Sequence, residues 1–117
     1  MSFSELLFEN GVTFDLNSTS RDDVLSEILT KIQENGGLQE GTFDEVLEKL
    51  IEREELGSTG VGNGIAVPHT KHSSIQVPLL SIARSSKGVN FGALDGEPVF
   101  LFFMLISPNK NANDHLK

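Results

Sequence analysis

The glycine-rich segment 58–69 constrains the fold more than any other part of the chain. Its three glycines occupy alternate positions, Gly60, Gly62 and Gly64. Glycine permits tight backbone curvature and the close approach of a ligand. A short apolar run follows and ends at Pro68, which lacks an N–H donor and favours an extended residue before it, so a buried strand ending there is predicted. His69 then lies beside a turn whose backbone N–H groups suit an anion or a phosphoryl group.

Composition and charge exclude several classes of protein. A chain of 117 residues predicts a single domain, residues 1–117, with its own core. The net charge of −8 argues against nucleic acid as a partner, because its phosphates require a basic surface. The chain has no cysteine, which excludes disulfides, thiolate metal sites and cysteine nucleophiles. The first residues lack the pattern of a signal peptide and the longest apolar run is too short to cross a bilayer, so we expect a cytoplasmic protein without membrane insertion.

Two amphipathic helices are predicted before the glycine-rich segment. The first follows Ser20, a good N-cap, and ends at Asn35-Gly36-Gly37. The second begins at Thr42, which forms a capping-box pattern with Glu45, and ends at Gly57. Their apolar residues recur at helical spacing: Val24, Leu25, Ile28, Leu29 and Ile32 in the first, and Phe43, Val46, Leu47, Leu50 and Ile51 in the second.

Short strands and turns make up most of the remaining chain. Leu6 to Phe14 is interpreted as an edge strand or loop, 70–74 as a polar loop, and 85–88 as a turn. Val77 to Ala83 is apolar enough for a buried strand. Val99 to Ile106 has no polar face, which is typical of a central strand covered on both sides. The pattern predicts an α/β layered domain with a mixed β-sheet flanked by helices.

Two stretches of sequence carry a family resemblance. They are Arg53-Glu54-Glu55-Leu56-Gly57-Ser58-Thr59 and Gly64-Ile65-Ala66-Val67-Pro68-His69. Together they resemble the signature of the fructose/mannitol class of IIA domains of the bacterial phosphoenolpyruvate-dependent phosphotransferase system, a class that includes the nitrogen-regulatory IIA proteins. The resemblance extends over nearly the whole chain, to Leu116.

This resemblance implies a phosphoryl relay centred on His69. The histidine after the proline would accept a phosphoryl group from the phosphocarrier protein HPr, or from its nitrogen-branch homologue. It would pass the group to a IIB domain in sugar transport or keep it as a regulatory mark. Imidazole suits this chemistry because its pKa near 6.5 leaves a nucleophilic nitrogen free at neutral pH. The other ring nitrogen must donate its proton to an acceptor such as a backbone carbonyl.

The resemblance also implies further site residues. An arginine at the offset of Arg53 lies near the phosphorylated histidine in the family, and a bidentate guanidinium can bind phosphoryl oxygens. His115 matches the second active-site histidine of the family. Ser58 and Thr59 either donate hydroxyls to the phosphoryl oxygens or close the turn. Gly60, Gly62 and Gly64 would offer backbone N–H groups to the same oxygens.

Other sites fit the sequence less well. His69 and His72 form His-x-x-His without a third ligand, which makes a weak metal site, and His72 is interpreted as a surface residue. The glycine spacing matches neither a dinucleotide fingerprint nor a P-loop, and no hydrolase elbow is present. We therefore expect neither a cofactor nor a metal.

Three functions remain open at this point. The first is a relay protein of the phosphotransferase system. The second is a regulatory interaction module, without sugar transport, whose binding to a target protein is switched by phosphorylation of His69. The third is a structural or metal-binding α/β domain in which the histidines are incidental. Residues 111–117 look like the start of a helix, and IIA domains continue here into a further helical segment, so the resemblance implies a domain truncated at its C-terminal helical part.

Overall fold

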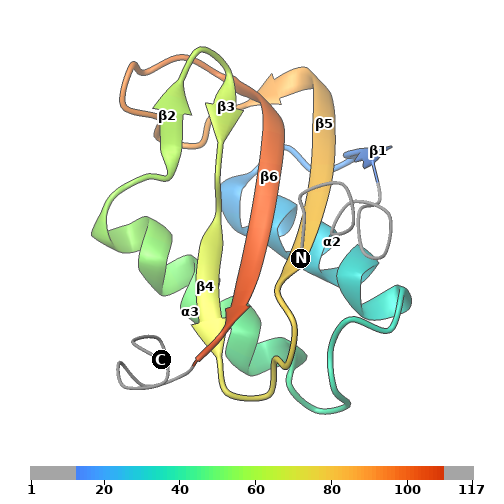
Figure 1. Ribbon diagram of the computed structural model, residues 1–117. Coiled ribbons are helices and arrows are strands. Elements are labelled where there is room, and N and C mark those ends of the chain that lie inside the picture. The colour runs from blue at the N-terminus through green and yellow to red at the C-terminus, as the bar shows by residue number, and fades with distance from the viewer. Residues whose placement is uncertain (1–12, 110–117) are drawn as a thin grey trace.

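The computed structural model describes residues 13–109 as two helices and six strands (Figure 1). The elements in chain order are β1 (Thr13–Asp15), α2 (Arg21–Glu34), α3 (Phe43–Leu56), β2 (Gly60–Gly62), β3 (Ile65–Ala66), β4 (His69–His72), β5 (Leu79–Val89) and β6 (Val99–Pro108). Both predicted helices are confirmed, each with the expected N-cap residue. Neither Ser20 nor Thr42 makes a side-chain capping hydrogen bond, and the Thr42 hydroxyl donates to the Gln39 carbonyl instead.

The six strands form one mixed sheet, as the α/β prediction required. Its order is β1-β5-β6-β3-β2, and β4 also pairs with β6. Strand β6 runs antiparallel to β5 and parallel to β3 and β4. Ala66 pairs with Phe102 and His69 with Leu105, so β3 and β4 are two parts of one interrupted strand beside β6 (Figure 1). The predicted loop 70–74 is therefore wrong for residues 70–72, where the chain continues the sheet.

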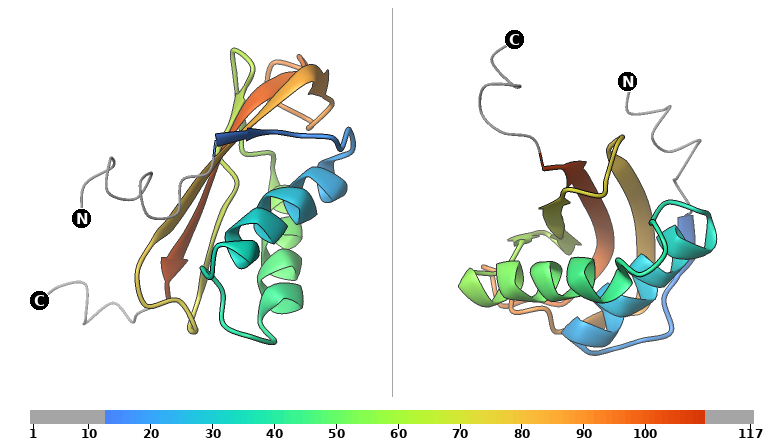
Figure 2. Two further views of the ribbon diagram at one scale, coloured as in Figure 1. Left: turned by 90° about the vertical axis from the view of Figure 1, so that its right-hand side faces the viewer. Right: turned by 90° about the horizontal axis from the view of Figure 1, so that it is seen from below.

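Both helices lie on the same face of the sheet (Figure 2). We call this the helix face and the opposite side the open face. The apolar stripes of α2 and α3 pack there against alternate residues of the central strands. Phe102, Met104 and Ile106 of β6 point to this face and are fully buried. Burial of this apolar surface is the main source of stability for the sheet.

Strand β6 differs from the expectation of a strand covered on both sides. Between the buried residues, Leu101, Phe103 and Leu105 are only partly buried. The side chains of a strand alternate between faces, and among residues 13–109 both helices cover only one of them. The all-apolar sequence indicated a central position correctly, but within residues 13–109 no helix covers the second face of β6.

Strand β5 is longer than predicted because the expected turn 85–88 is a bulge within it. The register shifts between Arg84 and Val89, where extra residues on β5 are accommodated. The Ser85 hydroxyl accepts the N–H of Gly88, whose φ is +84°. Ser-Ser-Lys-Gly has turn composition, but a bulge uses the same glycine conformation without ending the strand. Of the predicted segment Leu6 to Phe14, the described part belongs to β1, while the helix expected over 111–117 lies outside the described residues.

Candidate functional site

The three glycines form a β-hairpin. Gly62 pairs with Ile65, so Asn63 and Gly64 make a two-residue loop, with φ angles of +58° and +78°. Positive φ at both positions is the type I′ arrangement, for which Asn-Gly is the preferred sequence. Asn63-Gly64 was therefore the sequence signal for the hairpin, and the alternate spacing of the three glycines drew attention away from it. The Gly64 carbonyl accepts the N–H groups of Phe100 and Leu101, which joins the hairpin to β6.

Replacing Gly64 by alanine is expected to destabilise the protein by about 1–2 kcal/mol, because a side chain disfavours the left-handed conformation. The Cβ would also meet the Phe100 ring at 3.3 Å, although that ring is partly exposed and can shift. The measurement is urea unfolding. Val61→Ala is the matched control in the same hairpin, and its cost is expected to stay within about 0.5 kcal/mol because Val61 is 61% exposed. Equal midpoints for the two variants would contradict the hairpin assignment.

The tip of this hairpin is already bound by a carboxylate. The N–H of Asn63 donates to Asp95 at 3.1 Å, and Asp95 also accepts the N–H of Glu97. These backbone hydrogen bonds, first that of Glu97 and then that of Asn63, lower the pKa of Asp95. An anionic side chain therefore stands where the sequence suggested an anion-binding turn. The loop that carries Asp95 lies against the hairpin, since the Leu94 N–H donates to the Gly60 carbonyl.

The hydroxyls of Ser58 and Thr59 are engaged within the loop that precedes the hairpin. Ser58 Oγ donates to the Phe91 carbonyl and accepts the Gly60 N–H, both at 3.0 Å. Thr59 is buried, and its hydroxyl donates to the carboxylate of Glu54. Ser58 and Thr59 were expected either to bind phosphoryl oxygens or to close the turn, and the contacts of both hydroxyls close the turn. The Gly60 N–H is also committed, to Ser58.

The strand interruption at Val67 and Pro68 creates the acceptor that His69 needs. The Val67 N–H leaves the β6 ladder and donates to the Thr59 carbonyl at 3.1 Å, while the Pro68 carbonyl accepts the Leu105 N–H. The Val67 carbonyl lies 2.8 Å from Nδ1 of His69. A carbonyl can only accept, so Nδ1 carries the proton and Nε2 keeps its lone pair. His69 is exposed, which leaves Nε2 accessible to a partner.

The sheet places His69 and His72 on opposite faces. His69 pairs with Leu105 and shares the open face with it, whereas His72, three residues later in the same strand, points to the helix face. His72 is buried, so its assignment as a surface residue is wrong. Its Nδ1 accepts the Ser74 N–H at 3.1 Å, and its Nε2 lies 3.8 Å from Glu45 of α3. The polar neighbours of His72 did not reveal that α3 covers it.

Arg53 lies at the end of α3 that is level with His69. Helix α3 runs in the opposite direction to β4 (Figure 1), and Glu45 near its start lies 3.8 Å from His72 at the end of β4. Along α3, Arg53 lies eight residues beyond Glu45, which is about 12 Å. Along β4, His69 lies three residues before His72, which is about 10 Å, so Arg53 and His69 reach a similar level. Arg53 donates to the Gly57 carbonyl at 2.6 Å, a partner that a search for acidic neighbours misses. Within residues 13–109 no hydrogen bond joins Arg53 to His69, and the second histidine, His115, lies outside this range.

Glu54 is a site residue that the sequence analysis missed. It is 5% exposed and accepts the backbone N–H of Thr59 at 3.0 Å as well as the Thr59 hydroxyl. The signal was available, since Glu54 continues the buried stripe of Val46 and Leu50 at intervals of four residues. An acidic residue on the buried stripe of a helix requires hydrogen-bond donors, and Thr59 supplies two of them.

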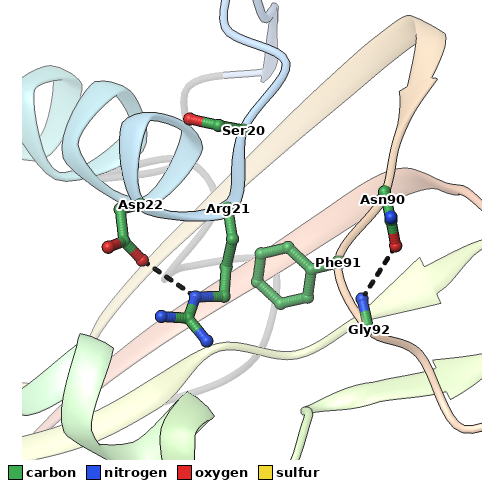
Figure 3. Close-up of a pocket in the computed structure, with 6 residues that line it drawn as sticks. All are labelled: Ser20, Arg21, Asp22, Asn90, Phe91 and Gly92. Atoms are coloured by element: carbon green, nitrogen blue, oxygen red, sulfur yellow. Dashed lines mark hydrogen bonds and ion pairs between the residues drawn. The ribbon is translucent and has the colours of Figure 1, made fainter.

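A hollow lies between the start of α2 and the segment 90–92 that follows β5 (Figure 3). Figure 3 shows the Phe91 ring beside Arg21, whose guanidinium is bound to Asp22 at 2.8 Å. The hydrogen bond to Asp22, and then the charges of Asp22, Glu55 and Glu54, raise the pKa of Arg21. None of the site residues predicted from the sequence lines this hollow. The charge of Arg21 is already balanced by neighbouring acidic residues. Phe91 connects this hollow to the loop before the hairpin, because its carbonyl accepts the Ser58 hydroxyl.

Comparison with known proteins identifies the family. Residues 5–117 match the family model described as "Phosphoenolpyruvate-dependent sugar phosphotransferase system, EIIA 2". The chain belongs to this family. The IIA assignment made from the two sequence stretches is thus confirmed. Within the described part of the IIA chain, no helix is long and apolar enough to span a membrane, and no three potential ligands cluster as a metal site.

The relatives of this IIA chain include sugar-specific and nitrogen-regulatory proteins. It is 33% identical over 117 residues to the fructose-specific EIIABC component of Bacillus subtilis, covering all of this chain and 18% of that protein. It is 40% identical over 98 residues to a nitrogen regulatory protein of Pseudomonas aeruginosa, covering 84% of this chain and 62% of the relative. The chain therefore spans less than two thirds of either relative.

Solved structures share the fold. Nitrogen regulatory protein IIA-Ntr from Neisseria meningitidis matches with a TM-score of 0.74 and 33% identity, covering 89% of this chain and 69% of that one. The mannitol IIA enzyme of Escherichia coli, in its complex with phosphorylated mannitol IIB, matches with a TM-score of 0.70 at 17% identity, covering 89% and 72% of the two chains. The second likeness extends the fold assignment to a more distant sequence.

Proposed function

We propose that this protein is a phosphoryl relay in which Nε2 of His69 is the acceptor. The observation that carries the proposal is the 2.8 Å contact between His69 Nδ1 and the Val67 carbonyl. It keeps the proton on Nδ1 and leaves a lone pair on an exposed nitrogen. Membership of the phosphotransferase IIA family supports the same assignment.

The transfer step requires only the imidazole and a phosphorylated donor. The Nε2 lone pair attacks phosphorus, the bond from phosphorus to the donor breaks, and the donor atom takes the bonding electrons. The product imidazolium retains its Nδ1 proton, which the Val67 carbonyl accepts as a charge-assisted hydrogen bond. The donor is HPr or its nitrogen-branch homologue, and the group passes to a IIB domain or marks the protein for a regulatory target. With these partners the relay operates in the cytoplasm.

Arg53 and His115 complete the proposed site. Because β4 pairs with no described strand on its outer side, the Arg53 guanidinium can reach around this edge toward His69. It would exchange the Gly57 carbonyl for phosphoryl oxygens and offset their charge. His115 would contact the same group. Backbone N–H groups of Gly62 and Gly64 are the remaining candidates of the glycine-rich segment, since that of Gly60 is committed to Ser58.

Labelling tests the proposal directly. The protein is incubated with enzyme I, HPr and radiolabelled phosphoenolpyruvate, and in a parallel reaction with the nitrogen-branch counterparts of the two donors. We expect one acid-labile, base-stable adduct per chain, located on His69 by mass spectrometry. A faster reaction with one donor set assigns the branch. No labelling by either set, or labelling at another residue, would overturn the proposal.

Arg53→Lys is expected to slow phosphoryl transfer by about a hundredfold, equivalent to about 3 kcal/mol of transition-state stabilisation. Lysine keeps the charge but loses the planar pair of donors. The measurement is the initial rate of labelling in quenched reactions, with circular dichroism to confirm the fold. Lys49→Arg is the matched control on the same helix and is expected to leave the rate unchanged. An unchanged rate for Arg53→Lys would show that Arg53 only binds the Gly57 carbonyl at the end of α3 and takes no part in the transfer.

A further inference from the structure

We infer that Glu54 is a positioning residue that sets the tautomer and orientation of His69. The inference rests on the proposed function, because it concerns the nitrogen that would take the phosphoryl group. Glu54 does not contact His69 directly. It acts through Thr59 and Val67, and each link in this path is a hydrogen bond of the described structure.

The first link joins α3 to the loop before the hairpin. Glu54 is 5% exposed, and its two oxygens accept separate donors of one residue, the backbone N–H and the hydroxyl of Thr59. A buried carboxylate without donors would be costly, so these bonds hold Thr59 firmly against the last turn of α3. The neighbouring Arg53 donates a hydrogen bond to the Gly57 carbonyl. The last turn of α3 thus holds the loop at two points.

The second link joins the loop to the strand interruption. The Thr59 carbonyl accepts the Val67 N–H at 3.1 Å, at the position where the chain has left β6. This bond fixes the peptide plane that precedes Val67, and the bond from the Leu105 N–H to the Pro68 carbonyl fixes the plane that follows Pro68. The Val67 carbonyl lies in the plane between them, which has no N–H of its own because the next residue is proline. Its direction is therefore set from these two sides, and Thr59 supplies one of them.

The third link joins the Val67 carbonyl to Nδ1 of His69 at 2.8 Å. Imidazole in water favours the tautomer with the proton on Nε2, which would block the nucleophile. The carbonyl selects the other tautomer, as second-shell acceptors do for metal-bound histidines. Displacement of this carbonyl would return the proton to Nε2. A carboxylate on α3 thereby controls the nucleophile on the opposite face of the sheet.

The test is the tautomer of His69 in the unphosphorylated full chain, read from the ¹⁵N shifts of its ring nitrogens at alkaline pH, where the ring is neutral. We expect mainly the Nδ1–H form in the wild type. Glu54→Met fills similar space without accepting a hydrogen bond, and it is expected to shift His69 toward the Nε2–H form and slow labelling by about tenfold. Glu52→Met, the same change at an exposed position of α3, is the control and should alter neither readout.

A second pair of variants covers the case in which Glu54→Met fails to fold. Thr59→Val removes only the hydroxyl, and Thr59→Ser restores it. We expect the valine variant to show the tautomer shift and the serine variant to resemble the wild type. Wild-type tautomer populations in every folded variant that lacks this contact would overturn the inference. Because the shifts are measured without phosphoryl transfer, a failure of labelling in the wild type would overturn the proposed function alone.

Discussion

Replacing His69 by alanine is expected to abolish phosphoryl uptake. The variant lacks the proposed nucleophile at the start of β4, so labelling should fall by more than about a hundredfold. Stability should change little, since the His69 side chain is exposed and its one described side-chain hydrogen bond, to the nearby Val67 carbonyl, is local. The measurement is the stoichiometry of radiolabel per folded chain after incubation with enzyme I, HPr and phosphoenolpyruvate.

His72→Ala is the matched control for this experiment. His72 lies in the same strand but points to the helix face, where it contacts Ser74 and Glu45. We expect full labelling of the folded fraction and a small loss of stability from the buried contacts. Stoichiometric labelling of His69→Ala, or loss of labelling in folded His72→Ala, would show that the acceptor lies elsewhere.

Replacing Phe102 by alanine is expected to lower the free energy of unfolding by about 3–5 kcal/mol. Phe102 is fully buried at the centre of β6, and its ring meets Phe91 edge to face with centroids 5.1 Å apart. Removing the ring loses both apolar burial and this aromatic contact and leaves a cavity. Small domains are stable by only about 5–15 kcal/mol, so this change removes a large part of the total.

Urea unfolding of Phe100→Ala provides the comparison for Phe102. Phe100 lies in the same strand, two residues away, but is 42% exposed. The same chemical change should therefore cost less than half as much as at Phe102. Equal losses at the two positions would contradict the difference in burial between Phe100 and Phe102. Because Phe102 pairs with Ala66, the labelling rate of folded Phe102→Ala also reports how far core packing reaches His69.

Local patterns were sufficient to predict the helices and the central strand. The stripes of α2 and α3 repeat at helical spacing, and the apolar run of β6 excluded a surface element. What failed depended on tertiary neighbours. His72 is polar in sequence and buried only because α3 crosses its strand. The 85–88 segment has turn composition, and its pairing with β6 determines whether it ends β5 or bulges within it.

The candidate site shows the same division. The sequence led to His69 as the proposed nucleophile and to the expectation of a backbone carbonyl beside its second nitrogen, and the Val67 carbonyl lies there. The partners of the preceding loop were not predictable. The hydroxyls of Ser58 and Thr59 could donate to phosphoryl oxygens. In the structure they donate instead to the Phe91 carbonyl and the Glu54 carboxylate. Asp95, thirty-two residues from Asn63, occupies the hairpin N–H that suggested an anion site. Contacts over such sequence separations leave no periodic signal.

The interruption between β3 and β4 also limits how this chain can change over evolution. Ala66 pairs with Phe102 and His69 with Leu105, so both segments advance by the same number of residues along β6. Inserting or deleting a single residue here would turn the histidine toward the helices, because neighbouring positions of a strand face opposite sides. A substitution here keeps the register of the strand, whereas a change of length does not. We therefore expect the number of residues between β3 and His69 to be constrained as strictly as the identity of His69 itself.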